Sequence, residues 1–460
     1  ENERHGRIWH QAPLWFLGNF QYFSIPIGFV GPALGLSLGW TIVAGALGIL
    51  TGTVFMAFHA TQGPTFGLPQ MIQSRAQFGY RGVVVPLFAT LFTYLAFNVA
   101  DQVLLAEGLH GAYGWSADLV AIVASVGAGL LAIYGHDWVH RMFRILLLIS
   151  FPLMTIVSLG ILFGAAGGHA PAHPLGFNTT AFFAQFSAGA AYNITYAPYV
   201  SDYSRYLPRD TPRGTIIGSV FFGASAGAIW LIALGAWLAT RFGATDGLVG
   251  LKDAGNAVIN HLGSLAAFFS AAALAATMGM NAYGGMLTVL TGVDSVHSIK
   301  PGRRARVSTI IALTVIWYAI AKSISGSAVS TVFTSLTLML YLLVPWTATN
   351  LVDFFFVRRG HYAITEIFNP DGIYGQWAWR GLVAYFVGFV CEIPFMILPD
   401  LSGWHYTGPA AKALGDVDIA WIVGLAVSAL VYLALSRSLD LSRERAAEAG
   451  SERELAEVMV

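Results

Sequence analysis

Long apolar stretches separated by short polar connections recur along this chain from Leu14 to Leu435. As a helix, each stretch is long enough to cross a hydrocarbon core about 30 Å thick. The pattern predicts an all-α polytopic membrane protein with twelve transmembrane helices. We place these spans at 14–37, 40–60, 83–109, 117–135, 140–165, 180–204, 213–240, 262–291, 307–325, 330–357, 381–399 and 417–435.

Two of these spans are poor continuous helices. The first contains LGNFQYFSIPIGFVGP and the sixth SAGAAYNITYAP, so Gly, Pro and Asn fall at their centres. Gly and Pro are common in transmembrane helices, which is one explanation. Because the two spans stand five apart, however, the pattern favours two inverted five-helix repeats, with a binding site near the membrane midplane.

This reading divides the chain into five parts. Residues 1–13 form a cytoplasmic N-terminal segment, 14–165 the first repeat and 180–357 the second. Residues 381–435 form two accessory helices, and the charged, helix-prone stretch 436–460 is expected to be a mobile cytoplasmic tail.

Positive charge is distributed unevenly between the two sides of the predicted membrane. Of the 24 Lys and Arg residues, 20 lie at the termini and in every second connection; the opposite loops hold only Arg241, Lys252, Lys322 and Lys412. Basic residues accumulate on the cytoplasmic side of membrane proteins. Both termini are therefore predicted to be cytoplasmic, in an inner or plasma membrane.

Composition excludes several other classes of protein. Charged residues make up 10% of the chain, against about 25% in a soluble domain. The net charge is zero, which gives no sign of a nucleic-acid partner. The single cysteine, Cys391, excludes a disulfide framework, and no His, Asp and Glu spacing resembles a metal site. We expect no cofactor other than a coupling ion, and the oligomeric state stays open, a monomer included.

An acidic residue, Asp101, lies near the middle of the third span in YLAFNVADQVLL. Placing an ionised carboxylate there costs about 2.5–3.5 kcal/mol on insertion scales, so such residues are usually functional. Phe97, Asn98 and Asp101 lie on one helical face, which must point into a cavity or against another polar helix. The alternative is that Asp101 only joins two spans by a hydrogen bond.

The eighth span carries Thr277 and Asn281 in an otherwise apolar, glycine-rich run. Hard cations prefer oxygen ligands. The Thr277 hydroxyl could therefore hold a small cation together with backbone carbonyls freed near Gly18 and Gln21 in the first span. Sodium is the candidate for this ion.

Three sequence motifs resemble the nucleobase–cation symport family, which includes purine–cytosine permeases and hydantoin and allantoin transporters. They are GPTFGLPQMIQSRAQFGYRG at 63–82, APYVSDYSRYLP at 197–208, and NLVDFFFVRRGHY with FNPDGIYG and WRG between 350 and 381. The resemblance runs essentially end to end. It implies a leucine-transporter-like fold of 5+5 inverted repeats plus two helices, and uptake of planar heterocycles by alternating access, coupled to sodium or protons.

The resemblance also implies a substrate held between aromatic rings of spans three and six. Phe97 falls where the family has a tryptophan, and Asp101 where it has an amide. The aromatic position of span six falls near Asn193, beside Tyr192, and one hydroxyl of the family's sodium-binding pair is replaced by Ala276. The residues predicted to line the substrate site are Asn19, Gln21, Phe97, Asn98, Asp101, Tyr192, Asn193 and Asn281, and those predicted for sodium are Gly18, Gln21 and Thr277.

The leading hypothesis is a secondary symporter that imports a purine- or cytosine-type nucleobase or a related nitrogenous heterocycle. A second is symport of a small guanidinium, amidine or vitamin-like cation with Asp101 as counter-ion, because a carboxylate can accept paired N–H groups. An intramembrane enzyme using Asp101 and Asp202 is disfavoured, because Asp202 is predicted near the cytoplasmic end of its span. A channel is disfavoured because channels more often surround a symmetric pore.

Overall fold

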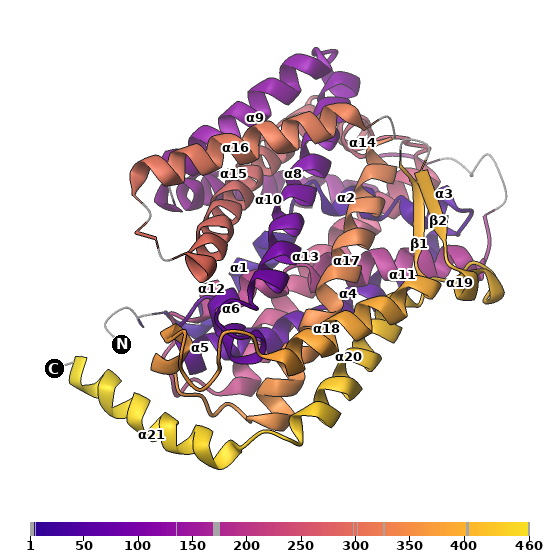
Figure 1. Ribbon diagram of the computed structural model, residues 1–460. Helices are drawn as coiled ribbons and strands as arrows, with labels where there is room; N and C mark the ends of the chain where they lie inside the picture. The colour runs from indigo at the N-terminus through magenta and orange to yellow at the C-terminus, as the bar shows by residue number, and fades with distance from the viewer. Residues whose placement is uncertain are drawn as a thin grey trace.

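The computed structural model is almost entirely helical, with a single two-stranded hairpin in the part of the chain that it describes. The described residues are 4, 6–134, 136–168, 175–297, 299–300, 302–324, 327–401 and 404–458. Both ends of the chain lie on one face of the molecule, at the lower left of Figure 1. We call this face the terminal face.

The first and sixth spans are broken, as the sequence predicts. The first consists of α1 (Gln11–Asn19), α2 (Ser24–Ile27) and α3 (Val30–Ala33). The sixth consists of α11 (Thr179–Ile194) and α12 (Ala197–Ser204). Since Pro198 has no N–H to donate to the carbonyl of Ile194, the helix cannot continue unbroken through this point.

Each of the other predicted spans corresponds to one helix. These are α4 (Leu38–Ala60), α8 (Val84–Tyr113), α9 (Ala117–Tyr134), α10 (His136–Leu162), α13 (Arg213–Arg241), α15 (Leu262–Val296), α16 (Arg303–Ser323), α17 (Ala328–Val352), α18 (Trp379–Glu392) and α20 (Ala420–Ser436). In the described chain, eight helices are long and apolar enough to span a membrane alone, so the count of twelve stays a prediction. The boundaries of the two repeats and the accessory pair also stay predictions.

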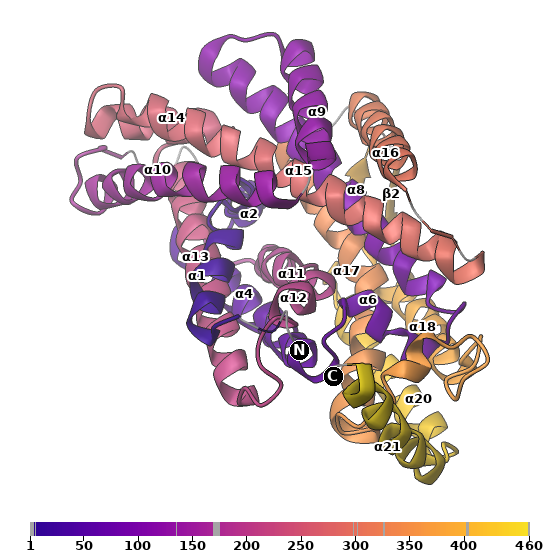
Figure 2. The same ribbon diagram turned by 90° about the vertical axis from the view of Figure 1, so that its left-hand side faces the viewer.

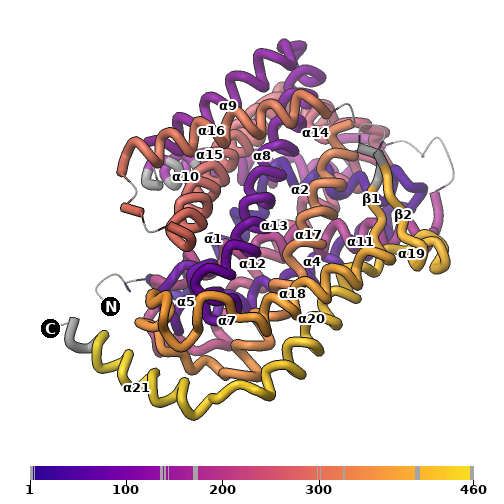
Figure 3. Tube along the Cα trace, viewed as in Figure 1, coloured from indigo at the N-terminus to yellow at the C-terminus, as the bar shows by residue number. Residues whose placement is uncertain are grey.

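Short helices connect these spans: α5 (Gln62–Phe66), α6 (Gln70–Gln73), α7 (Arg75–Phe78), α14 (Gly247–Val258) and α19 (Pro409–Ala413). On the terminal face, α5 and α6 lie beneath the end of α8 (Figure 1), and α7 lies next to them (Figure 3).

Helices α1, α4, α11, α12 and α13 form a bundle, seen side by side in Figure 2. Glycines bring their backbones together. A Cβ at Gly48 of α4 would lie 2.1 Å from the carbonyl oxygen of Phe186 in α11, and one at Gly235 of α13 would lie 2.0 Å from that of Ile25 in α2. Such close packing needs small residues at the contact. Helices α8, α9, α15 and α16 pack together as a second group. Gln21 and Phe97 of the predicted site lie where the two groups meet.

One predicted boundary is wrong. The span predicted at 381–399 ends at Glu392 in α18, because Pro394 cannot donate to the carbonyl of Val390. After Pro394 the chain forms an antiparallel hairpin of β1 (Ile397–Leu401) and β2 (Trp404–Thr407), on the side away from the terminal face (Figure 1).

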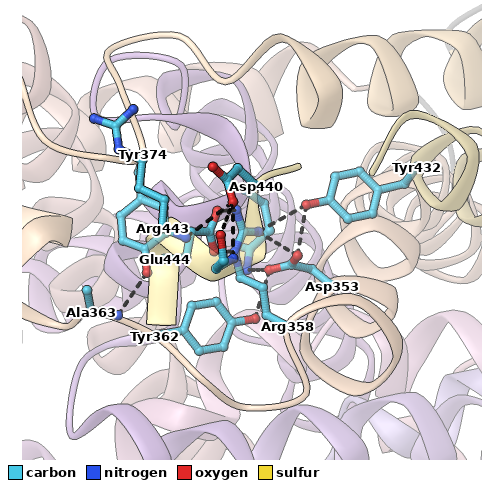
Figure 4. A network of polar contacts seen from close by, with 11 residues as sticks. Asp353, Arg358, Tyr362, Ala363, Tyr374, Tyr432, Asp440, Arg443 and Glu444 are labelled. Atoms are coloured by element: carbon cyan, nitrogen blue, oxygen red, sulfur yellow. Dashed lines mark hydrogen bonds and ion pairs between the residues drawn. The ribbon is translucent and has the colours of Figure 1, made fainter. Parts of the chain in front are cut away.

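The segment expected to be a mobile tail is helix α21 (Leu441–Val458), which runs along the terminal face (Figure 3). Arg358, just after α17, donates two hydrogen bonds to the Glu444 carboxylate, at 2.6 and 2.9 Å (Figure 4). The tail is therefore docked on the transmembrane part of the structure.

Candidate substrate site

The two helix breaks meet at the centre of the molecule, and side chains satisfy backbone groups that the first break frees. Ser24 donates its hydroxyl to the carbonyl of Asn19 at 2.6 Å, and lies 3.0 Å from the hydroxyl of Tyr192 in α11. Buried carbonyls need such partners because no water competes for them in the membrane. The break in α1 is thereby joined directly to the broken sixth span.

Aromatic rings from three segments surround this point. Phe23 stacks on Tyr192, with ring centroids 5.5 Å apart and planes inclined by 17°, and lies edge-on to Phe97 of α8 at 5.3 Å. Tyr196, at the break in the sixth span, lies 5.8 Å from Phe97 and 5.5 Å from Tyr192. The four rings form an aromatic cluster of the kind that binds planar ligands by stacking.

A chain of amide and hydroxyl groups crosses from α8 to α15 and α12. Asn281 donates to Asn98 at 3.2 Å and accepts a hydrogen bond from the hydroxyl of Tyr199 at 3.3 Å. Asn98 donates in turn to the carbonyl of Met278 at 3.1 Å. The side chains of Asn98, Asn281 and Tyr199 thus connect the second helix group to α12, the second helix of the broken sixth span.

Asp101 lies one turn beyond Phe97 on α8, with 1% of its surface exposed. Neither carboxylate oxygen has a hydrogen-bond partner among the residues that the structure describes. A buried polar group without a partner requires an explanation, and a ligand that supplies N–H groups is one.

The three residues predicted for sodium are in contact with one another. The side-chain amide of Gln21 donates to the carbonyl of Gly18 at 2.9 Å, and its oxygen accepts the hydroxyl of Thr277 at 2.7 Å. The Gln21 nitrogen also lies 3.1 Å from the hydroxyl of Tyr196. Gln21 therefore bridges α1, α15 and the break in the sixth span.

Six of the eight residues predicted for the substrate site lie together here: Gln21, Phe97, Asn98, Asp101, Tyr192 and Asn281. The side chains of Asn19 and Asn193 turn away from them. Asn19 donates to the carbonyl of Ala224 in α13 at 3.1 Å, and Asn193 donates to the hydroxyl of Thr53 in α4 at 2.6 Å. Both join helices of the bundle and do not reach the aromatic cluster.

A cavity of about 480 Å³ leads from the terminal face toward this centre. Its inner wall includes Tyr94, one turn before Asn98, and Tyr199, whose rings are 4.7 Å apart. Its outer part is lined by Asp202 and Arg205 near the end of the sixth span, and by Ile72 of the connecting segment. Tyr94 and Tyr199 thus separate the cavity from the aromatic cluster.

A second pocket, of about 520 Å³, lies between α8, α9 and α15. Leu119, Val123 and Phe268 line it together with other apolar side chains. With so few polar atoms it cannot read the edge of a heterocycle, and it faces the side where the exposed residues of α9 are apolar. We therefore place the site at the helix breaks and not in this pocket.

Sequence reasoning missed four residues of the site: Phe23, Ser24, Tyr196 and Tyr199. Tyr192, Tyr196 and Tyr199 are spaced at i, i+4 and i+7, which marks a helical face even across the break. The sequence therefore contained a signal for these tyrosines. It contained no such signal for Phe23, because the position of Phe23 depends on the path of the unwound chain between α1 and α2.

Comparison with known proteins now identifies the family. Residues 1–424 match the family model described as permeases for cytosine/purines, uracil, thiamine and allantoin. The chain belongs to this family. A putative purine-cytosine permease of Bacillus subtilis is 34% identical over 440 residues, covering 95% of this chain and 93% of the relative. A purine-cytosine permease of Emericella nidulans is 27% identical, covering 93% and 84%.

Among solved structures, the chain resembles Mhp1, a nucleobase-cation-symport-1 family transporter, in a closed conformation with bromovinylhydantoin bound. The TM-score is 0.70 at 16% identity, over 96% of each chain. The inward-facing conformation of Mhp1 gives 0.71, over 97% of this chain and 94% of that one. These matches confirm the leucine-transporter-like fold. Membership of this family confirms that the chain is a multi-pass membrane permease and not an enzyme.

Proposed function

We propose that this permease is a secondary symporter that imports a nucleobase of the purine or cytosine type, or a closely related heterocycle, by alternating access. The observation that carries the proposal is the unpartnered carboxylate of Asp101 beside an aromatic cluster, at the point where the first and sixth spans break. The permeases of Bacillus subtilis and Emericella nidulans support the substrate class.

The chemistry of the cluster suits a flat heterocycle with N–H groups along one edge. Stacking between a base and an aromatic side chain contributes about 1–3 kcal/mol per base. The amino group of neutral cytosine or adenine stands beside a ring nitrogen that only accepts hydrogen bonds, whereas guanine presents a ring N–H beside its amino group. An ionised Asp101 could therefore accept one hydrogen bond from the amino group of cytosine or adenine, or two from the guanine edge. Charge-assisted bonds of this kind are about twice as strong as neutral ones.

A second candidate substrate is a small cation with a guanidinium or amidine group, or a vitamin-like compound. No salt bridge to Asp101 is found in the described part of the chain, so a bound cation could neutralise the carboxylate. A neutral nucleobase would instead leave a buried charge or bind to protonated Asp101. Competition between the two ligand classes for one site separates the candidates.

We further propose that the protein lies in the cell membrane with its terminal face in the cytoplasm. The excess of Arg and Lys in the connections on that side supports this orientation. The cavity lined by Asp202 and Arg205 would then face the cytoplasm, as in an inward-facing state.

The test is transport by purified protein in liposomes. Labelled cytosine, adenine and hypoxanthine should accumulate above the external concentration when an inward cation gradient is imposed, and unlabelled base should compete. Guanidine and benzamidine, tested as competitors, probe the second candidate. Equilibration without accumulation would indicate a channel, and the absence of uptake and of ligand-induced stabilisation for every base would overturn the proposal.

A further inference from the structure

The side chain of Gln21 occupies the position between α1 and α15 where the sequence suggested a sodium ion. Its nitrogen donates to the carbonyl of Gly18 at 2.9 Å, and its oxygen accepts the hydroxyl of Thr277 at 2.7 Å. Gln21 is 5% exposed and Thr277 4% exposed, so water hardly competes for these bonds. One neutral amide thus connects the two elements that a cation would otherwise hold together.

The oxygens nearby are already engaged. The carbonyl of Gly18 accepts the hydroxyl of Tyr196 at 3.3 Å as well as the Gln21 amide, and the carbonyl of Asn19 accepts the Ser24 hydroxyl at 2.6 Å. A hard cation needs several oxygen lone pairs directed at one point. Here those lone pairs are directed at N–H and O–H groups, and residue 276 is an alanine without a hydroxyl. The residues present do not fit a sodium ion.

We infer that Gln21 takes the place of a coupling sodium ion, so that substrate binding and transport by this protein do not require sodium. What the inference implies for transport rests on the proposed function as a symporter. Under that proposal the cation left to drive uptake is a proton. The hydrogen bonds of Gln21 connect α1 and α15 permanently, whereas a sodium ion would connect these two helices only when it is bound.

Two measurements on the unaltered protein test this. Sodium is titrated into purified protein at constant ionic strength with potassium as replacement, and the melting temperature is followed. Cytosine and adenine binding are then measured in both salts. We expect no saturable sodium effect on the melting temperature, and affinities that agree within about twofold. Saturable stabilisation by sodium, or base affinity that rises about tenfold or more in sodium, would overturn the inference.

Variants at position 277 add a second test. Thr277→Val keeps the shape but removes the hydroxyl, and Thr277→Ser keeps the hydroxyl as a matched control. If the hydroxyl bonds to Gln21, Thr277→Val lowers the melting temperature in sodium-free buffer while Thr277→Ser changes it little. Combining Thr277→Val with Gln21→Ala should cost less than the sum of the two single changes, because both remove the same bond.

A sodium site predicts the opposite pattern. Thr277→Val would then leave the protein unchanged in potassium and abolish a stabilisation seen only in sodium. The two proposals can also fail separately. If no base binds in either salt, the proposed substrate class is wrong, but the sodium titration and the Thr277 variants still decide whether Gln21 replaces the ion.

Discussion

Arg358 and Glu444 form an ion pair with two hydrogen bonds, which holds the C-terminal helix α21 on the terminal face. The Arg358 side chain is 4% exposed and that of Glu444 is 12% exposed. Arg358 also pairs with Asp353, which accepts hydrogen bonds from the hydroxyls of Tyr362 and Tyr432 (Figure 4). Helix α21 is thus tied to a network that begins at the end of α17 and includes α20.

Glu444→Gln should loosen α21. The change removes the charge of one partner and leaves Arg358 buried with Asp353 alone. Losing a charge-assisted buried bond costs about 1.5–3 kcal/mol. We expect faster proteolysis in the connection between α20 and α21, with the transmembrane part still folded. Glu452→Gln is the matched control, since its pair with Arg209 is exposed on both sides and worth at most about 1 kcal/mol. Equal proteolysis rates for the two variants would contradict the docking role of Glu444.

The sequence predicted most of the membrane architecture but not this docking. Apolar length, the basic connections and the two broken spans are local signals. The structure confirms the two broken spans, while the count of twelve spans and the cytoplasmic orientation of the termini stay predictions. The position of α21 depends instead on long-range contacts such as Arg358 with Glu444 and Thr365 with Ser451, each pair 86 residues apart. A charged amphipathic stretch is compatible with a free tail and with a docked helix, so composition alone could not decide. The hairpin after Pro394 was missed for the same reason, since an apolar run does not by itself specify a helix.

Asn193 offers a test of which polar residues belong to the site. Its side chain donates to Thr53 at 2.6 Å, on the side of α11 away from the aromatic cluster. Asn193→Ala should therefore lower stability by about 0.5–1.5 kcal/mol for the lost hydrogen bond, because Thr53 keeps its bonds to Ile49 and Ser225. The affinity of the folded protein for a base should stay within about threefold. A drop in affinity without a drop in melting temperature would return Asn193 to the site.

Sequence reasoning could locate the site, but it could not separate the residues that face the site from those that pack between helices. Gln21, Phe97 and Asn281 stood out as polar or aromatic groups at membrane depth, and so did Asn19 and Asn193. Which of them point inward depends on the rotation of each half-helix after its break. No periodicity reaches across the unwound residues between α1 and α2, so neither the direction of Asn19 nor the place of Phe23 followed from the pattern.

Phe23 should contribute to substrate binding although the sequence did not single it out. Its ring stacks on Tyr192 and meets Phe97 edge-on. Phe23→Leu keeps an apolar side chain but loses the aromatic face, and aromatic pairs are worth about 0.5–1.5 kcal/mol beyond their buried area. Titrating base into the variant should show affinity reduced by about three- to tenfold. Phe16→Leu, which alters an aromatic stack with Phe20 on the far side of α1, should leave affinity unchanged.

Asp101 carries the prediction on which the substrate class depends. Asp101→Asn keeps the shape of the side chain but replaces one acceptor oxygen by an N–H group, so that a donor can face a donor on the ligand. Because the structure gives Asp101 no hydrogen-bond partner in the described chain, the substitution removes no hydrogen bond seen there. The melting temperature of ligand-free Asp101→Asn should therefore change little, because the shape of the side chain is kept and no hydrogen bond is lost.

The same preparation should bind base about tenfold or more weakly, equivalent to about 1.4 kcal/mol. Measuring apo stability and affinity together separates a binding residue from one that only joins two spans. A residue that joined spans would give a less stable apo protein whose folded fraction binds normally. Unchanged affinity with unchanged stability would remove Asp101 from the site. Guanidine competition that disappears in Asp101→Asn while base binding persists would favour the cationic substrate class instead.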